Sequence, residues 1–392
     1  MASVPTTTAE LGEKDLHHWR VLEDFQEVLA QASAQAKLPP TLADPRRKLD
    51  GAAYLSLFLF GLFNPVVESM RGLCSISRLP KVQAAIGGPK VSLGSFSEMQ
   101  AVLEPALLEQ VFRRLCERAP ARAGEDPRLA RLNLVIQDGS LWRALPRMAW
   151  AEYGVGCKGE AKGVRLHLRF HLVADQPLAA RVTPGKRCER QALRQMCQAG
   201  QTNVGDRYYG EDYQLFRDIE KAGGFFVFRI KENAVVHAES ELPLSPADRA
   251  AGVVRHAWAR LGANVRSPRL RLVEIRTAEQ HLWLVTNLPP ERAEAELISL
   301  IYRRRWAVEL FFRWIKCILG CRHFFAESPQ GVALQLYLAL IASLLFQHYT
   351  GRRPNKRIME LIQFHQLGWA SAAELRPLLA TELAKLKPAK KR

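Results

Sequence analysis

The amino-acid sequence predicts a mixed α/β domain that is interrupted by a β-rich stretch and flanked by helical regions. Residues 131–235 alternate between short apolar strands and amphipathic helices, as the segments of an α/β layer do. Residues 236–290 contain strand-like pieces in which Arg is interleaved with apolar residues. Residues 1–125, and those from 291 onward, carry apolar residues at helical spacing.

The N-terminal region, residues 1–125, is predicted to be helical. The segments "LEDFQEVLAQASAQAKL" and "SFSEMQAVLEPALLEQVFRRLCERA" place apolar residues three and four apart, and the second begins with a Ser suited to capping. Between them, "RLPKVQAAIGGPKVSLGSF" is rich in Gly and Pro, which is typical of a loop. No sequence pattern in this region predicts a DNA-recognition helix of the helix-turn-helix type.

The α/β part is predicted from strands that alternate with helices. "LNLVIQDGS" is a short apolar strand that ends in Asp138, and "GVRLHLRFHLV" and "PLAARVTPG" follow as strands. "ERQALRQMCQ" is a helix, and "QTNVGDRYYG" then brings Asp206 just after a Val-containing stretch. "EDYQLFRDIEKAG" and "GFFVFRIKENAVV" are a helix and a strand. We therefore divide the chain into 1–125, 130–345 with the β-rich insertion at about 236–290, and a helical 346–392 with a basic tail.

The charge of the chain points to a polyanionic partner. Lys and Arg total 56 against 39 Asp and Glu, which gives a formal net charge of +17. Such a balance is typical of proteins that bind nucleic acid, and less often of those that bind an anionic membrane surface. A basic protein without such a partner is the alternative.

Neither a membrane span nor a secreted, disulfide-rich protein is expected. The start of the sequence shows no signal peptide, and the apolar runs Ala52–Phe63 and Val332–Phe346 fall short of the roughly 20 residues that span a bilayer. They are predicted to be buried helices. The seven cysteines are scattered, as reduced thiols of a cytoplasmic protein are. Cys317, Cys321 and His323 lie close together, but no second ligand pair follows, which disfavours zinc.

The segment "IYRRRWAVELFFRWIKCILG", residues 301–320, combines charge with aromatic surface. On a helix over 301–317, five polar residues fall within an arc of roughly 80°: Tyr302, Arg305, Glu309, Arg313 and Lys316. A solvated face with i,i+4 ion pairs is one interpretation. The other is a row of cations that binds phosphates, since Arg and Lys suit that role.

Two earlier carboxylates favour the second interpretation. Asp138 and Asp206 each lie near a strand end in the α/β part, and Glu309 lies on the amphipathic helix. Three such carboxylates can hold two divalent cations. Two ions about 3.5–4 Å apart clamp a scissile phosphate, one activating the nucleophile and one the leaving oxygen.

The same residues resemble those of a known family. Tyr302, Arg305, Glu309 and Lys316 match the Tyr-x2-Arg-x3-Glu-x6-Lys signature of IS4-type transposases in all four places, and Arg305 is followed by Trp as is often seen there. "VIQDGS" and "VGDRYY" resemble the blocks around the family's two aspartates, and "FVFRIK" and "LVTNL" resemble its flanking strands. The resemblance covers about residues 130–345.

The resemblance implies an RNase H-like core whose catalytic triad is Asp138, Asp206 and Glu309, interrupted by the β-rich insertion. It implies two Mg2+ ions, which Mn2+ can replace. It also implies an enzyme that binds the terminal inverted repeats of an insertion sequence, cleaves its ends by hydrolysis and joins them to target DNA. Tyr302, Arg305 and Lys316 would hold phosphates, and the helical region 1–125 would help to bind the terminal inverted repeats. The enzyme would act as a homodimer on two paired ends, and no membrane would be involved.

Further DNA contacts are expected from Arg207, which follows Asp206, and from Arg313 on the basic helix face. A Trp of the family's insertion can stack on a flipped-out base, and Trp283 and Trp258 are the candidates here, although a role in the core is favoured for both. Two other functions stay open. One is a transposase-derived DNA-binding protein that no longer cuts, and the other is an RNase H-like nuclease without strand transfer.

Overall fold

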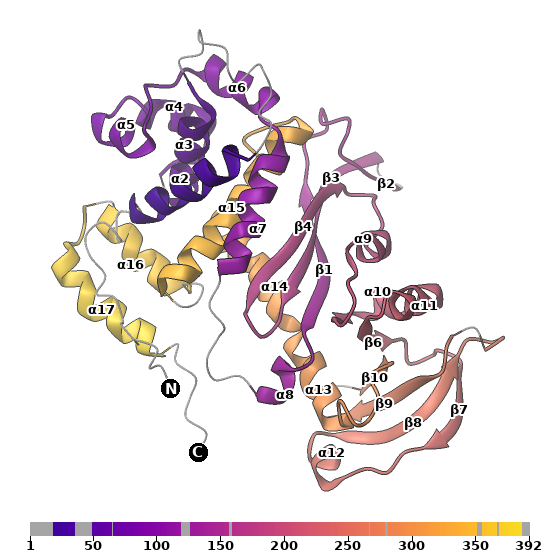
Figure 1. Cartoon of the computed structure of the whole chain (residues 1–392). Helices are drawn as coiled ribbons and strands as arrows, with labels where there is room; N and C mark the ends of the chain where they lie inside the picture. The colour runs from indigo at the N-terminus through magenta and orange to yellow at the C-terminus, as the bar shows by residue number, and fades with distance from the viewer. Residues whose placement is uncertain are drawn as a thin grey trace. The chain divides into compact units, whose positions relative to one another are not determined.

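The computed structural model describes residues 19–35, 49–64, 66–118, 126–156, 159–265, 267–278, 281–350, 355–366 and 368–385 (Figure 1). The chain divides into two compact units. A helical unit comprises residues 1–119 and 314–392, and an α/β unit comprises residues 120–313. Helices from the two ends of the chain therefore belong to the same unit.

The helical unit consists of packed helices around apolar side chains. Phe58 stacks on Phe325 with ring centroids 5.5 Å apart, and Phe63 meets Phe346 edge-on at 4.9 Å. Its elements are α2 (Trp19–Ser33), α3 (Gly51–Phe63), α4 (Met70–Ile76), α5 (Pro80–Ile86), α6 (Leu93–Val102), α7 (Pro105–Arg118), the π-helix η2 (Trp314–Ile318), α15 (Pro329–Thr350), α16 (Lys356–Gln366) and α17 (Ala372–Lys385).

The two apolar runs form buried helices, as predicted. Ten of the thirteen residues of α3 are buried. In α15, the segment Pro329–His348 is long and apolar enough to cross a membrane by length and composition. However, 83% of its apolar stretch is buried inside the protein. Such burial is typical of a core helix, because its apolar surface is already covered by protein.

One prediction for this unit was wrong. The Gly- and Pro-rich stretch at residues 78–96 is not all loop, since it contains α5 and the start of α6. Pro80 occupies the first turn of α5, where its missing N–H costs nothing, and Gly87 ends that helix with a φ of 66°. Here Pro and Gly bound a short helix.

The α/β unit is built on one mixed ten-stranded sheet, which confirms the predicted α/β class. The strand order is β2-β3-β1-β5-β6-β10-β9-β8-β7, with β4 paired to β3. Its elements are α8 (Pro127–Ala130), β1 (Leu134–Arg143), β2 (Glu152–Gly156), β3 (Gly159–His171), β4 (Gln176–Pro184), α9 (Glu189–Met196), β5 (Thr202–Gly205), α10 (Arg207–Gly210), α11 (Tyr213–Lys221), β6 (Phe225–Ile230), β7 (Val236–Glu241), α12 (Pro246–Ala250), β8 (Val253–Leu261), β9 (Leu270–Arg276), β10 (His281–Thr286), α13 (Ala295–Arg304) and α14 (Trp306–Arg313).

The two halves of this sheet differ in strand direction. Strands β1, β5 and β6 run parallel, whereas β3 pairs antiparallel with β1, and β4 pairs antiparallel with β3. The strands within residues 236–290 pair antiparallel with one another, and β10 joins them to β6. The β-rich stretch therefore extends the sheet sideways (Figure 1).

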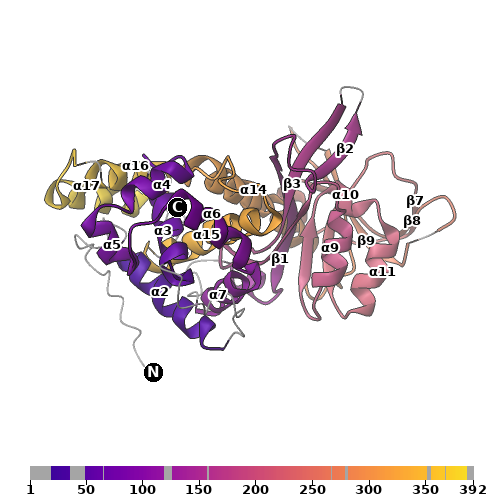
Figure 2. The ribbon, with the colours of Figure 1, turned by 90° about the horizontal axis from the view of Figure 1, so that it is seen from above.

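Helices cover both faces of β1, and the strand periodicity decides which residue meets which helix. Trp142 on β1 packs edge-on against Phe312 of α14, with centroids 6.4 Å apart. Side chains an even number of residues apart on a strand point to the same face of the sheet. Asp138 is four residues before Trp142, so it faces the side that carries α14. Gly139 faces the other side, where its neighbour is Glu189 at the start of α9. Figure 2 shows α9 and α11 together on that side of the sheet.

Candidate active site

Asp138 and Asp206 lie at equivalent positions on neighbouring parallel strands. The β1–β5 register runs from Leu134 opposite Thr202 to Ile136 opposite Val204. Two residues beyond this last pair, β1 reaches Asp138 and the chain leaving β5 reaches Asp206. Side chains alternate between the faces of a strand, and the charge of Asp206 acts on Asp138, so the two carboxylates share one face and lie near each other.

The local surroundings of the two carboxylates differ. Asp138 lies within β1, and the prediction that the strand ends there was wrong, because β1 continues to Arg143 by pairing with β3. One of its oxygens accepts a hydrogen bond from the Gly139 N–H at 2.8 Å. Asp206 follows β5 directly and caps α10, accepting a hydrogen bond from the Tyr208 N–H at 2.9 Å.

Negative charge accumulates around Asp138. The pKa of Asp138 is raised to about 7, chiefly by burial and also by the carboxylates of Glu189 and Asp206. The Gly139 N–H and the charge of Arg305 act in the opposite direction. A half-buried carboxylate beside two others is stabilised in its ionised form by a bound cation.

The signature residues lie on two consecutive helices, so the prediction of one helix over residues 301–317 was wrong. Helix α13 ends at Arg304, Arg305 forms a turn, and α14 starts at Trp306. The chain then forms η2, in which the Leu319 N–H donates to the Trp314 carbonyl at 3.0 Å, five residues back. A π-turn changes the angular spacing of side chains, so Lys316 does not follow the α-helical arc.

Tyr302, Arg305 and Glu309 remain together despite the turn. Arg305 donates to Glu309 at 2.6 Å, and its guanidinium carbon lies 5.7 Å from the centre of the Tyr302 ring. Burial opposes the charge of Arg305, but Tyr302, Glu309 and Asp138 raise its pKa. Burial also raises the pKa of Tyr302, and Asp206 is one of the charges that acts on it. These electrostatic interactions place the motif beside both aspartates.

The other predicted DNA contacts have varied positions. Arg207 and Arg313 are exposed, at the start of α10 and the end of α14. Lys316 is half-buried in η2, which belongs to the helical unit. Trp283, on β10, packs against the core beneath α11 and donates to His281 at 3.1 Å. Trp258, on β8, is covered by Arg269 at 4.6 Å.

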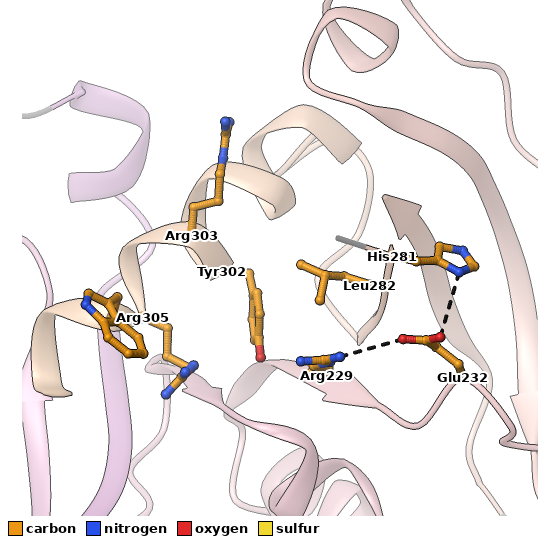
Figure 3. Close-up of a pocket in the computed structure, with 8 residues that line it drawn as sticks. Arg229, Glu232, His281, Leu282, Tyr302, Arg303 and Arg305 are labelled. Atoms are coloured by element: carbon orange, nitrogen blue, oxygen red, sulfur yellow. Dashed lines mark ion pairs between the residues drawn. The ribbon is translucent and has the colours of Figure 1, made fainter. Parts of the chain in front are cut away.

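A cavity of about 610 Å³ lies beside the signature residues. Figure 3 shows Tyr302, Arg305 and Arg229 converging on it, while Arg303 points away from them. The Nε atoms of Arg229 and Arg305 are buried and have no hydrogen-bond partner among the residues that the structure describes. Trp306 also lines the cavity and is 57% exposed. The remaining lining residues are Glu232, His281, Leu282 and Arg303.

The donor chemistry fits a divalent cation at the aspartates. Carboxylate oxygens are the ligands that Mg2+ and Mn2+ prefer, and Asp138 and Asp206 supply them side by side. Within the described ranges, no group of three or more His, Cys, Asp or Glu side chains is arranged to hold a metal ion. Glu309 is instead engaged by Arg305.

Sequence reasoning did not select three residues that the structure places here. Glu189, at the start of α9, interacts electrostatically with both aspartates, and nothing in "ERQALRQM" marks it. Arg229 ends a strand and also lacks a distinguishing signal. Trp306 did carry a distinguishing signal in the sequence, because it follows Arg305 directly in the signature.

Comparison with known proteins identifies the family. Residues 130–345 match the family described as "Transposase DDE domain". The chain belongs to this family. The match covers β1, the strands that follow it and the signature helices, and so includes Asp138, Asp206 and Glu309. Members of the family use divalent metal ions and act on DNA.

Two curated relatives are transposases of bacteria. The probable transposase for insertion sequence element IS5377 of Geobacillus stearothermophilus is 31% identical over 235 residues, which cover 59% of each chain. The putative transposase y4zB of Sinorhizobium fredii is 29% identical over 230 residues, 57% of this chain and 63% of that one. The match thus spans about three fifths of the length of these relatives.

A solved structure of a piggyBac transposase synaptic complex with hairpin DNA covers all of this chain and 90% of that one. Its TM-score is 0.45 at 10% identity, a likeness too low to inform fold or function.

Proposed function

We propose that this member of the DDE family is the transposase of an IS4-type insertion sequence. It binds the terminal inverted repeats of the element, cleaves the ends by metal-dependent hydrolysis and joins them to target DNA. The observation that carries the proposal is the equivalent placement of Asp138 and Asp206 on β1 and β5, with Glu309 and Arg305 electrostatically coupled beside them. The catalytic triad is Asp138, Asp206 and Glu309.

The strand order supports an RNase H-like core. Three strands, β4, β3 and β1, pair antiparallel, and β5 and β6 continue the sheet in parallel with β1. The first aspartate then lies on the central strand β1, and the second follows the neighbouring strand β5. The extra strands β7 to β10 are inserted between the second aspartate and the glutamate, and so lengthen that interval.

The triad is suited to hold two Mg2+ ions, for which Mn2+ can substitute. Such ions activate the attacking oxygen and stabilise the leaving oxygen of a phosphodiester. The chain's own part is to place anionic oxygens at one point of the sheet and to surround them with cationic donors. Arg305 donates a hydrogen bond to Glu309 at 2.6 Å and so orients this carboxylate.

The cavity is suited to hold the DNA backbone at the cleavage point. The buried, unpartnered Nε atoms of Arg229 and Arg305 are donors that a phosphate would satisfy, and burial strengthens a charge-assisted hydrogen bond. Tyr302 adds a hydroxyl on the same wall. Lys316, Arg207 and Arg313 add positive charge for phosphates along the duplex, in a chain of formal charge +17.

An unstacked base also has a place in this cavity. Trp306 presents an exposed ring at its edge, and aromatic rings stabilise flipped-out bases by stacking. Trp283 was a candidate for this role, although a role in the core was favoured for it. Its packing against the core favours Trp306 instead. We further infer a homodimer that acts on two paired ends, in the cytoplasm where the DNA is.

Strand transfer is the step that separates this function from its rivals. The full chain is mixed with a labelled duplex that carries the element's own end, a supercoiled plasmid and Mg2+. The transposase joins the labelled end to the plasmid, and Asp138→Asn does not. Cleavage without joined product would identify a nuclease, and tight binding without cleavage would identify a DNA-binding protein that has lost activity.

A further inference from the structure

Two glycines adjoin the two aspartates, and each makes room for a side chain from the far face of the sheet. A Cβ added to Gly139 would lie 2.8 Å from the carboxylate of Glu189. A Cβ added to Gly205 would lie 2.7 Å from the ring of Tyr209. At distances under 3.0 Å one of the two groups would have to shift, so glycine is what permits both close approaches as they stand.

The two side chains that fill these spaces, Glu189 and Tyr209, are joined by a hydrogen bond. The Tyr209 hydroxyl donates to a carboxylate oxygen of Glu189 at 3.2 Å. Arg165 of β3 forms an ion pair with the other oxygen, and its Nε donates to the Gly185 carbonyl at 3.1 Å. Tyr209 is 3% exposed and stacks on Phe228 of β6. We call this hydrogen bond between Glu189 and Tyr209 the bridge. Arg165 holds its Glu189 end, and the stacking on Phe228 holds its Tyr209 end.

The bridge lies where the backbone pairing of β1 and β5 has ended. The register of the two strands runs to Ile136 opposite Val204, two residues before the aspartates. Beyond that point β1 pairs on its other side with β3, and the chain after Gly205 turns into α10. The separation of the two aspartates is thus not fixed by the strand ladder at their own positions.

We propose that Glu189 and Tyr209 are positioning residues that fix the separation of Asp138 and Asp206 from the opposite face of the sheet. Through Gly139 the Glu189 carboxylate supports β1, and through Gly205 the Tyr209 ring supports the end of β5. Their hydrogen bond ties the two supports together. The inference rests on the proposed function, because it assumes that the two aspartates bind the metal.

The consequence of losing the bridge is a looser metal site in a protein that still folds. A divalent cation needs both carboxylates at a set separation, and outer groups that orient ligands change metal affinity or activity by about 10- to 100-fold when removed. Tyr209→Phe keeps the ring in the space beside Gly205 and its stacking on Phe228, but removes the hydroxyl. Glu189→Gln keeps the length of the side chain but removes the charge that pairs with Arg165.

The test is Mn2+ binding to the full chain without DNA, measured by isothermal titration calorimetry. Tyr209→Phe is expected to weaken binding about tenfold, and Glu189→Gln by at least as much. Asp218→Asn on α11 is the matched control, since it also removes a carboxylate paired with an arginine, Arg194, and it should bind Mn2+ as the wild type does. Thermal unfolding in EDTA checks that every variant is folded.

Asp138→Asn separates the two ways in which the idea can fail. If it abolishes Mn2+ binding while Tyr209→Phe binds normally, the bridge has no positioning role and only this inference falls. If Glu189→Gln alone weakens binding, Glu189 acts directly on the metal and the bridge is again excluded. If Asp138→Asn binds Mn2+ normally, the metal site itself is wrong, and the proposed function falls with the inference.

Discussion

Asp138 and Asp206 each lie two residues beyond the last backbone pair that joins β1 to β5, Ile136 opposite Val204. This parallel register brings together two carboxylates that are 68 positions apart in the chain, because 206 minus 138 equals 202 minus 134. Arg305, whose charge acts on Asp138, forms an ion pair with Glu309 of α14.

Arg305 is expected to bind the element's end through both the positive charge and the planar shape of its guanidinium group. Arg305→Ala should weaken binding of a labelled end at physiological salt by about tenfold or more, which is typical for loss of a charged hydrogen bond. Arg305→Lys should restore only part of it, because lysine lacks the planar fork. Lys316→Ala should weaken binding or end cleavage too.

Arg260→Ala serves as the control for these variants, because Arg260 is ion-paired with Glu239 on the inserted strands. It should bind the end as the wild type does. Normal end binding and cleavage by both Arg305→Ala and Lys316→Ala would refute the assignment of these residues to phosphates.

Trp306 is expected to matter for processing of the end, and Trp283 for stability. Trp306→Ala removes an exposed ring at the cavity and should slow end cleavage without lowering the melting temperature. Trp283→Ala removes a ring packed against the core and should lower that temperature. Cleavage assays and thermal unfolding of both variants decide the matter, and the reverse pattern would return the base-stacking role to Trp283.

Gly139→Ala should destabilise the protein because the new methyl group meets Glu189. The added Cβ would lie 2.8 Å from that carboxylate, and such overpacking costs about 1–3 kcal/mol in free energy of unfolding. Glu189→Ala in the same chain removes the obstacle, so the double variant should lose less than the sum of the two single losses. Strict additivity in urea unfolding would show that the two residues do not meet.

Acid should destabilise the fold through His256. This residue on β8 accepts a hydrogen bond from Arg271 at 3.0 Å, and burial, with the charge of Arg271, lowers the pKa of His256 to about 4. In the unfolded chain the His256 ring takes up a proton near pH 6.5. The contribution of neutral His256 to the free energy of unfolding is therefore complete above that pH and is lost as the pH falls toward 4. The contribution changes by at most about 1.4 kcal/mol per pH unit.

His256→Gln keeps a hydrogen-bond acceptor for Arg271 and removes the titration. Urea unfolding between pH 4.5 and 7.5 should show a shallower decline for this variant than for the wild type. Equal slopes would mean that His256 titrates alike in both states. Because Arg271 also donates to Leu288 and Ala293 just before α13, this buried cluster supports the helix that carries Tyr302.

The sequence allowed the α/β class to be predicted and led to the proposed triad, since both depend on local patterns. Period-two strands, helical spacing and the spaced signature around Glu309 are each readable within about 20 residues. Other features were not predictable in this way. The extension of β1 past Asp138 depends on pairing with β3, and the turn at Arg305 and the π-turn at Trp314 depend on tertiary packing.

Glu189 shows most clearly what a local pattern cannot reveal. It is the first residue of an ordinary amphipathic helix, and its role arises because Gly139 and Tyr209, on two other elements, meet it in space. Arg229 is similar, since only the fold places it in one cavity with Arg305. Motif spacing predicts residues that act from one segment, whereas supporting residues require the tertiary structure.

The central claim is that Asp138, Asp206 and Glu309 form a metal-dependent DNA-cleaving site, and one cleavage assay tests it most directly. A labelled duplex carrying the element's own end is incubated with wild type or Glu309→Gln, in Mg2+ and in EDTA, with end binding measured in parallel. We expect nicking at the element boundary by the wild type in Mg2+ alone, and by Glu309→Gln in neither condition, although both proteins bind the end. Full cleavage by Glu309→Gln in Mg2+, or by the wild type in EDTA, would contradict the account.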